Sequence, residues 1–275
     1  MGFGVGETVI HLVTFASDDM SISAQRCIES AERMGVDRVH RTAPVKPSSE
    51  RGHGFWKWKP QVILAIMEGD GSPFLKPLND GDILIYADAG VEFIEPVSIV
   101  IDRMDQDIWL FGNETLHRHW CKRDIIDAVW KITPKNGSDQ GRTASWDRFD
   151  KQVQASVIFF RVNDYTRAFV KEWLDWCLYS VKTYTEVDGY KTIKSEHFLI
   201  DDSPSVAPNH PEFKENRHDQ AILTTLAYRE GIKLHHWYVR YHDRTPGRGP
   251  FYPNDDYPPL YLHHRRRNHE WEQAA

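Results

Sequence analysis

The chain has 275 residues, of which 40% are hydrophobic and 27% are charged. This is the composition of an ordinary globular protein, long enough for one large α/β domain or two small ones. The net charge of −6 argues against general binding of nucleic acids, and no apolar run approaches the roughly 18 residues that cross a bilayer. Three widely spaced cysteines are typical of reduced thiols, so we expect a cytoplasmic protein without a transmembrane segment.

Short apolar runs typical of buried strands alternate along the chain with longer amphipathic stretches typical of helices. The predicted strands are 8–16, 36–40, 83–87, 108–111, 153–162 and 232–239. The predicted helices are 21–34, 60–69, 96–104, 123–132, 165–184 and 218–230. Polar, proline-containing or glycine-containing segments are expected to be loops at 41–54, 133–145 and 184–215, and a tail at 241–275. This order predicts a single α/β domain with an elaborated C-terminal half.

The segment GDILIYADAG at 81–90 places one carboxylate, Asp88, at the end of a predicted buried strand. Strand ends in α/β sheets are common ligand sites, and a carboxylate there suits a divalent cation that carries a diphosphate. The alternative is that Asp88 only caps the next turn. Glu92 lies four residues further on and either approaches the same cation or belongs to the surface of the next element.

Two tryptophans and two lysines precede the predicted helix at 60–69, in the sequence FWKWKP. Lys59 lies at a helix start, where cations and free N–H groups can hold a phosphate. Trp56 offers a flat platform for a base or a sugar. The alternative is that the tryptophans are core residues and the lysines are solvated.

Two further polar clusters are candidates for a site. Asp219 and Gln220 open the helix at 218–230, where an acidic side chain also simply favours the positive helix end. In the tail, His263 and His264 can bind a metal and Arg265 can bind phosphate, although a charged run near a terminus is usually solvated.

Three motifs in this order resemble a group of bacterial and viral glycosyltransferase-like proteins whose usual patterns are GYWxWKP, YxDAGxE and RxDQ. Here they read GFWKWKP at 54–60, YADAGVE at 86–92 and RHDQ at 217–220. Such proteins are similar to nucleotide-diphospho-sugar transferases of GT-A type. The resemblance implies a Rossmann-type mixed sheet flanked by helices, in which about 1–112 bind the nucleotide sugar and about 113–275 bind the acceptor.

The resemblance also implies the ligands and the roles of individual residues. We expect a UDP- or GDP-sugar donor, a hydroxyl of a glycan acceptor, and Mn²⁺ or Mg²⁺ on the diphosphate, with a role in polysaccharide biosynthesis. Because Gly90 stands at the second position of the usual Asp-x-Asp pair, other side chains are expected to complete the metal site. The expected metal ligands are Asp88, Glu92, His263 and His264. The expected donor-binding residues are Thr14, Phe15, Ala16, Ser17, Trp56, Lys59, Asp88, Ala89 and Arg265.

The resemblance assigns catalysis to the start of the last long helix. Asp219 is the general base if the enzyme inverts the configuration of the sugar. If the configuration is retained, which a DQ pair at this place favours, Asp219 and Gln220 only stabilise the sugar cation. Two other functions stay open: a metal-dependent nucleotide phosphohydrolase, which would cluster several carboxylates and histidines, and a non-catalytic sugar-binding protein, suggested by ten tryptophans.

Overall fold

The computed structural model describes residues 8–42, 50–69, 71, 75–131, 144–187, 190–235, 239–241, 260–264 and 267–272. Arg265 and most of the predicted loop at 133–145 lie outside these ranges. Within them, no helix is both long and apolar enough to span a membrane.

Most predicted elements form, with ends that differ by a few residues from the predicted ends. The strands are β1 (Ile10–Phe15), β2 (Arg38–Arg41), β3 (Ile83–Asp88), β4 (Val91–Phe93), β5 (Ile108–Leu116), β6 (Lys151–Arg161), β7 (Ser180–Val187), β8 (Tyr190–Phe198), β9 (Leu234–His235), β10 (Val239–Tyr241) and β11 (Tyr261–His263). The α-helices are α1 (Ser21–Arg33), α2 (Gly52–Phe55), α3 (Trp58–Glu68), α4 (Ser98–Ile101), α5 (Arg123–Lys131), α6 (Asp164–Cys177), α7 (His218–Glu230) and α8 (Asn268–Glu272).

A six-stranded mixed sheet in the order β2-β1-β3-β6-β5-β9 forms the centre of the molecule. Strands β2, β1 and β3 are parallel, whereas β6 runs antiparallel to both β3 and β5. The carboxyl ends of β1 and β3 therefore lie at the same edge as the first half of β6. Strand β6, from the half predicted to bind the acceptor, lies between two strands from the half predicted to bind the donor.

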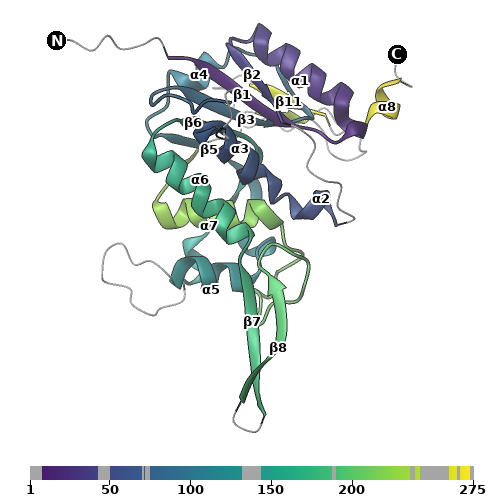
Figure 1. The fold of residues 1–275 in the computed structure, drawn as a ribbon, viewed down its shortest axis with the longest axis vertical. Helices are drawn as coiled ribbons and strands as arrows, with labels where there is room; N and C mark the ends of the chain where they lie inside the picture. Colours follow the sequence, from purple (N-terminus) through teal and green to yellow (C-terminus); the bar gives the residue numbers. More distant parts are fainter. Residues whose placement is uncertain are drawn as a thin grey trace, which may run out of the picture.

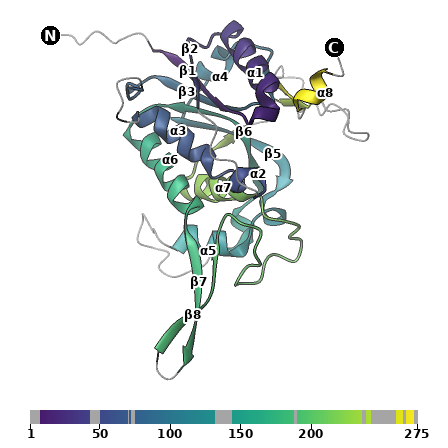
Figure 2. The same cartoon turned by 45° about the vertical axis from the view of Figure 1, so that its right-hand side comes forward.

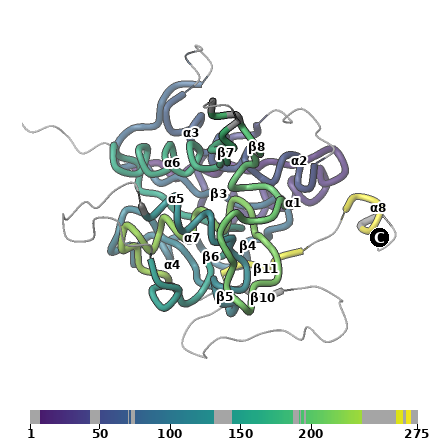
Figure 3. The backbone as a smooth tube through the Cα atoms, turned by 90° about the horizontal axis from the view of Figure 1, so that it is seen from below, coloured from purple at the N-terminus to yellow at the C-terminus, as the bar shows by residue number. Residues whose placement is uncertain are grey.

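Side chains that alternate along the central strands build one apolar core on each face of the sheet. In β3, Leu84 and Tyr86 pack into the core beneath α3, α6 and α7, whereas Ile83 and Ile85 pack into the core beneath α1 and α4. Helices α3 and α6 lie side by side over the first of these faces (Figures 2 and 3). The sheet is thus covered on both sides, which holds its carboxyl edge rigidly.

The predicted helix at 165–184 and the predicted loop that follows it are corrected by the structure. Helix α6 ends at Cys177, and β7 and β8 then form a two-stranded antiparallel ribbon that extends away from the body (Figure 1). The reason is local, because β-branched residues at the alternate positions 181, 183 and 185 favour extended backbone over helix.

The C-terminal segment folds back onto the N-terminal half. Strand β11 pairs with β4 and with β10 in a separate three-stranded sheet. The side chain of Asn268, at the start of α8, accepts a hydrogen bond from the backbone N–H of Ile22 and donates one to the carbonyl of Asp18. This closing segment, residues 260–264 and 267–272, is thereby tied to the turn that follows β1.

Candidate functional site

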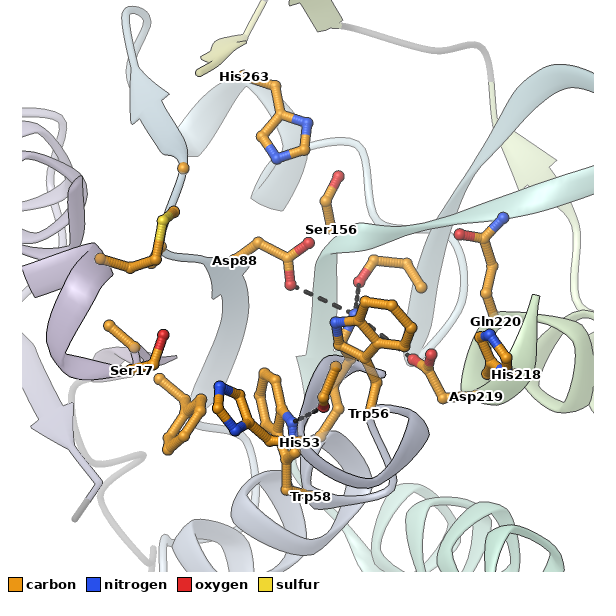
Figure 4. A pocket seen from close by; sticks show the side chains of 18 of the residues that line it. Ser17, His53, Trp56, Trp58, Asp88, Ser156, His218, Asp219, Gln220 and His263 are labelled. Carbon is orange, nitrogen blue, oxygen red and sulfur yellow. Dashed lines mark hydrogen bonds and ion pairs between the residues drawn. The ribbon is translucent and has the colours of Figure 1, made fainter. Parts of the chain in front are cut away.

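A cavity of about 480 Å³ opens at the carboxyl edge of the central sheet. Its walls come from the turn after β1, the turn after β3, the first half of β6, the α2–α3 segment and the start of α7. The closing segment adds His263, His264 and Arg267. Figure 4 shows Asp88, Ser156, Asp219 and the aromatic side chains around this space. The three motif regions singled out in the sequence thus contribute to one cavity.

Lys59 joins the three regions at the floor of the cavity. Its ammonium group lies 3.3 Å from Asp88 Oδ1 and 3.4 Å from Asp219 Oδ2. It also donates a hydrogen bond to the carbonyl oxygen of Ala155 at 2.9 Å. The Lys59 and Asp219 side chains are 5% exposed, whereas that of Asp88 is 31% exposed. One buried cation therefore lies between a carboxylate that faces the cavity and a carboxylate that is almost fully buried.

Burial and these contacts set the protonation states of Lys59 and Asp219. Burial raises the pKa of Asp219 to about 6, with the ammonium of Lys59 opposing the shift. For Lys59 the two carboxylates outweigh the effect of burial and raise its pKa above the ordinary lysine value. Lys59 is therefore a fixed positive charge at neutral pH, and Asp219 is a carboxylate that gains a proton only slightly below neutral pH.

Asp88 keeps one oxygen for a further ligand. Tyr86 donates its hydroxyl hydrogen bond to Asp88 Oδ1 at 2.6 Å, on the same oxygen that faces Lys59. The ring of His263 points into the space that Asp88 faces (Figure 4). A carboxylate and an imidazole suit Mn²⁺ or Mg²⁺ when the phosphates of a nucleotide supply the other oxygens. In the part of the chain that the structure describes, no three His, Cys, Asp or Glu side chains come together as a metal cluster.

Glu92 lies outside the lining of this cavity. Its carboxylate contacts Arg26 and accepts a hydrogen bond of 2.7 Å from Nε2 of His264. Strand β4 explains this direction, because Val91 and Phe93 point into the core and Glu92 points to the opposite side. The structure therefore places Glu92 behind His264, whereas the sequence suggested a position on the same cation as Asp88.

Gly90, at the position where a second aspartate was expected, is required by the closing segment. A Cβ atom at residue 90 would lie 2.1 Å from the carbonyl oxygen of His264, which is far inside van der Waals contact. The backbone N–H of His264 also donates to the carbonyl of Gly90 at 2.7 Å. No side chain fits there without moving the closing segment, which brings two histidines to this position instead.

The backbone at the mouth of the cavity is strained. Among the described residues, all four non-glycine residues with a left-handed φ lie here: His53 (53°), Phe55 (58°), Trp56 (61°) and His218 (52°). Such conformations are costly, and surrounding contacts must hold them. The buried ring of His218 packs against the rings of Phe55 and Trp56, with centroids 5.0 and 5.3 Å apart. Contacts between α2 and α7 therefore maintain the shape of this wall.

The remaining predicted residues divide into three groups. Phe15, Ala16, Ser17, Ala89 and Trp56 line the cavity, and so does Gln220, whose amide donates to Gln152 at 2.7 Å. Thr14 is buried within β1 and does not line the cavity. Arg265 lies outside the described residues.

The sequence assigned no role to several lining residues, and their separation in the chain explains this. Gln154 and Ser156 belong to an apolar strand, β6, and reach the cavity only because β6 runs antiparallel to β3. Met20 comes from the turn before α1, which no periodic pattern marks. Arg51 and Arg267 belong to segments that the sequence did mark, but neither was given a role of its own. The RHDQ motif was the only available signal for Arg217 and His218.

No protein-family model matches the sequence, and no curated protein matches it either. The fold is similar to that of the apo structure of WbbM, a bifunctional glycosyltransferase, with a TM-score of 0.50 and 11% identity over 96% of this chain and 47% of that one. The chain thus spans about half the length of the WbbM structure. Weaker likenesses are to apo mouse xyloside xylosyltransferase 1 (TM-score 0.43, 10% identity, 94% of this chain and 98% of that one) and to an active-site mutant of LgtC (TM-score 0.42, 12% identity, 94% and 88%).

The likeness to WbbM concerns the fold, at an identity too low to carry an activity with it. In this chain the central sheet is mixed and has helices packed on both faces. The expected fold class is therefore confirmed: this chain has a GT-A-like α/β fold, a mixed central sheet flanked by helices.

Proposed function

We propose that this protein transfers a sugar from a nucleoside diphosphate sugar, a UDP- or GDP-sugar, to a hydroxyl group of a glycan acceptor. The observation that carries the proposal is the contact of Lys59 with both Asp88 and Asp219. Three motifs that are far apart in the sequence meet within 3.4 Å at the floor of a cavity. If these side chains lay on separate surfaces, the three motifs would not support a common active site.

The donor is proposed to lie between β1 and the closing segment. The nucleoside would contact Phe15, Ala16 and Ser17, and its diphosphate would reach the Asp88 side of the cavity, with Ala89 and Trp56 as further walls. Arg267 of the closing segment lines the cavity on this side. Arg265 stays a proposed phosphate-binding residue on the basis of the sequence alone. Buried or fixed positive groups stabilise a leaving diphosphate strongly, because they need no reorganisation during the reaction.

The metal site is proposed at the same place. Asp88 Oδ2 and His263 would hold Mn²⁺ or Mg²⁺, with His264 beside them and Glu92 orienting the His264 ring, as carboxylates often do behind metal-bound histidines. When bound, the cation neutralises charge that develops on the diphosphate. Lys59 contributes a permanent positive charge from beneath Asp88, so both groups act on the same leaving group.

In the proposed reaction the bond between the anomeric carbon and the phosphate oxygen breaks, and a bond to the acceptor oxygen forms. We favour retention of configuration, in which the acceptor attacks from the side of the leaving group and its proton passes to a phosphate oxygen. The ion pair between Asp219 and Lys59 at 3.4 Å supports this choice, because Asp219 is 5% exposed and already neutralised by a cation. Asp219 and Gln220 would then stabilise the positively charged sugar.

The first experiment measures thermal unfolding of the protein with UDP, GDP, CMP and free sugars, each with and without Mn²⁺. Binding to the native state alone raises the melting temperature. We expect stabilisation by UDP or GDP, increased by Mn²⁺, and consumption of a nucleotide sugar with transfer to an added glycan. Stabilisation by free sugars alone would instead indicate a sugar-binding protein. Fast release of the nucleotide without any acceptor would indicate a hydrolase.

A further inference from the structure

Two arginines lie together in the wall of the cavity formed by α2 and α7. Arg51 precedes α2 and Arg217 immediately precedes α7, so they come from distant parts of the chain. Their side chains are 44% and 38% exposed. Both belong to the wall that carries Trp56 and Gln220, whereas the proposed nucleoside and metal sites are built from β1, β3 and the closing segment.

One carboxylate serves both guanidinium groups. Glu215 lies 2.9 Å from Arg217 Nη2 and 3.5 Å from Arg51 Nη1. A guanidinium group has five N–H donors and carries a full positive charge at any pH of interest. The longer of the two contacts, to Arg51, is at the limit of hydrogen bonding. Both guanidinium groups thus line the cavity beside a carboxylate that they already hold.

The plane of Arg217 is also held in place. Its guanidinium carbon lies 4.3 Å from the centre of the Trp120 ring, and that of Arg51 lies 5.9 Å from the centre of the Trp56 ring. Stacking on an aromatic ring reduces the freedom of an arginine while its edge remains available for hydrogen bonds. A pair of arginines restrained in this way suits a planar or multidentate anion, which a single solvated lysine would bind poorly.

We infer that the acceptor of the proposed transferase carries an anionic group, as in a uronic acid or a sugar phosphate, and that Arg51 and Arg217 bind it. This inference rests on the proposed function, which makes the bound molecule the acceptor, and it adds the chemical class of that acceptor. Two partly exposed arginines in one wall of the cavity are distinctive in a chain whose net charge is −6. Glu215 shows that a carboxylate fits between the two guanidinium groups.

The test compares matched ligands by direct binding, in the presence of UDP and Mn²⁺. The probes are methyl glucuronide, glucose 6-phosphate and methyl glucoside, of which the last is the neutral equivalent of the first two. We expect an anionic probe to bind at least tenfold more tightly than methyl glucoside, with an affinity that falls as salt increases. Preference for the glucuronide would identify a carboxylate, and preference for the phosphate would identify a phosphoryl group.

Two variants connect the preference to these residues. Arg217→Gln and Arg51→Gln keep a polar side chain but remove the charge, and each is expected to lower the affinity for the anionic probe by about tenfold or more. The control is Arg161→Gln, at an exposed arginine 3.8 Å from Asp107 that does not line the cavity. This control should bind all three probes as the wild type does.

Three results would overturn the inference. The first is equal binding of the neutral and anionic probes by the wild type, and the second is an unchanged preference in both arginine variants. The third is a loss of UDP binding in Arg51→Gln and Arg217→Gln, because the arginines would then serve the donor. Failure of the proposed function looks different: the wild type would neither bind nor consume any nucleotide sugar, whatever its preference among the three probes.

Discussion

Replacement of Lys59 by methionine tests the arrangement at the floor of the cavity. The ammonium group lies 3.3 and 3.4 Å from two carboxylate oxygens. At an effective dielectric constant of about 20, each attraction is roughly 5 kcal/mol before the cost of desolvation. Loss of one partner of a buried ion pair usually costs about 3–5 kcal/mol, because the remaining charge stays buried. Lys59→Met should therefore lower the free energy of unfolding by about that amount, and the melting temperature by on the order of 10 °C.

The sign of the pH dependence follows from Asp219. Its folded pKa of about 6 lies above its ordinary value of 3.8, so the native state binds the extra proton and is favoured as pH falls. Without Lys59, which lowers this pKa, the folded pKa must rise further. The loss of stability in Lys59→Met should therefore be largest near pH 8 and should shrink towards pH 5, where Asp219 is protonated.

Urea unfolding of four proteins measures this effect: the wild type, Lys59→Met, Asp219→Asn and the double variant. The double variant should recover about half of the loss or more, because the uncompensated charge at residue 219 is gone. Lys171→Met is the control, since Lys171 pairs with Asp175 on an exposed helix surface, where such a pair contributes little to stability. A loss below about 1 kcal/mol in Lys59→Met, or a loss of equal size at pH 5 and pH 8, would refute the reasoning.

Three more variants or conditions test the rest of the site. Asp88→Ala should abolish sugar transfer while thermal unfolding shows an intact fold, and near wild-type transfer rates would contradict the metal assignment. Gly90→Ala should displace the closing segment, because a Cβ atom would meet the carbonyl of His264 at 2.1 Å, and we expect UDP to stabilise this variant less than the wild type. The control is Gly81→Ala, at a glycine where an added Cβ would have no atom within 4 Å. This control strains its own backbone but should leave UDP binding unchanged. Sugar transfer by the wild type should decrease as pH falls below about 6, because Asp219 then loses its charge, and a flat rate from pH 8 to pH 5 would argue against an ionised Asp219.

Local patterns in the sequence were sufficient for most strands of the central sheet, for the longer helices that cover it and for single positions in the site. The helix predicted at 218–230 is α7 with the same ends, since its apolar spacing and Gly231 mark both. Asp88 was placed at a strand end by the apolar run before it, and it lies there. Such features depend on residues close together in the chain, where propensity and periodicity carry the information.

Features that depend on distant residues could not be predicted in this way. The contact between Lys59 and Asp219 joins positions 160 residues apart, and nothing in either motif shows that Lys59 points into the protein. Glu92 was expected near Asp88 because of their spacing, yet the alternation of β4 directs it to Arg26 and His264. The ribbon formed by β7 and β8 was missed because tryptophans at helical spacing in α6 suggested that the helix continued.

The two oxygens of Asp88 would allow the proposed site to use both a lysine and a cation. Tyr86 and Lys59 approach Oδ1 from inside the protein, so this oxygen is oriented before any ligand arrives. Oδ2 is then directed to the cavity, where His263 also points. A second aspartate at residue 90 would add negative charge, but the closing segment excludes it sterically. At the proposed metal site, one carboxylate and one imidazole would hold a divalent cation less strongly than two carboxylates, and the phosphates of the proposed donor would supply the missing negative charge. Cation binding and donor binding should therefore depend on each other at this site, with Lys59 keeping Asp88 in position when both are absent.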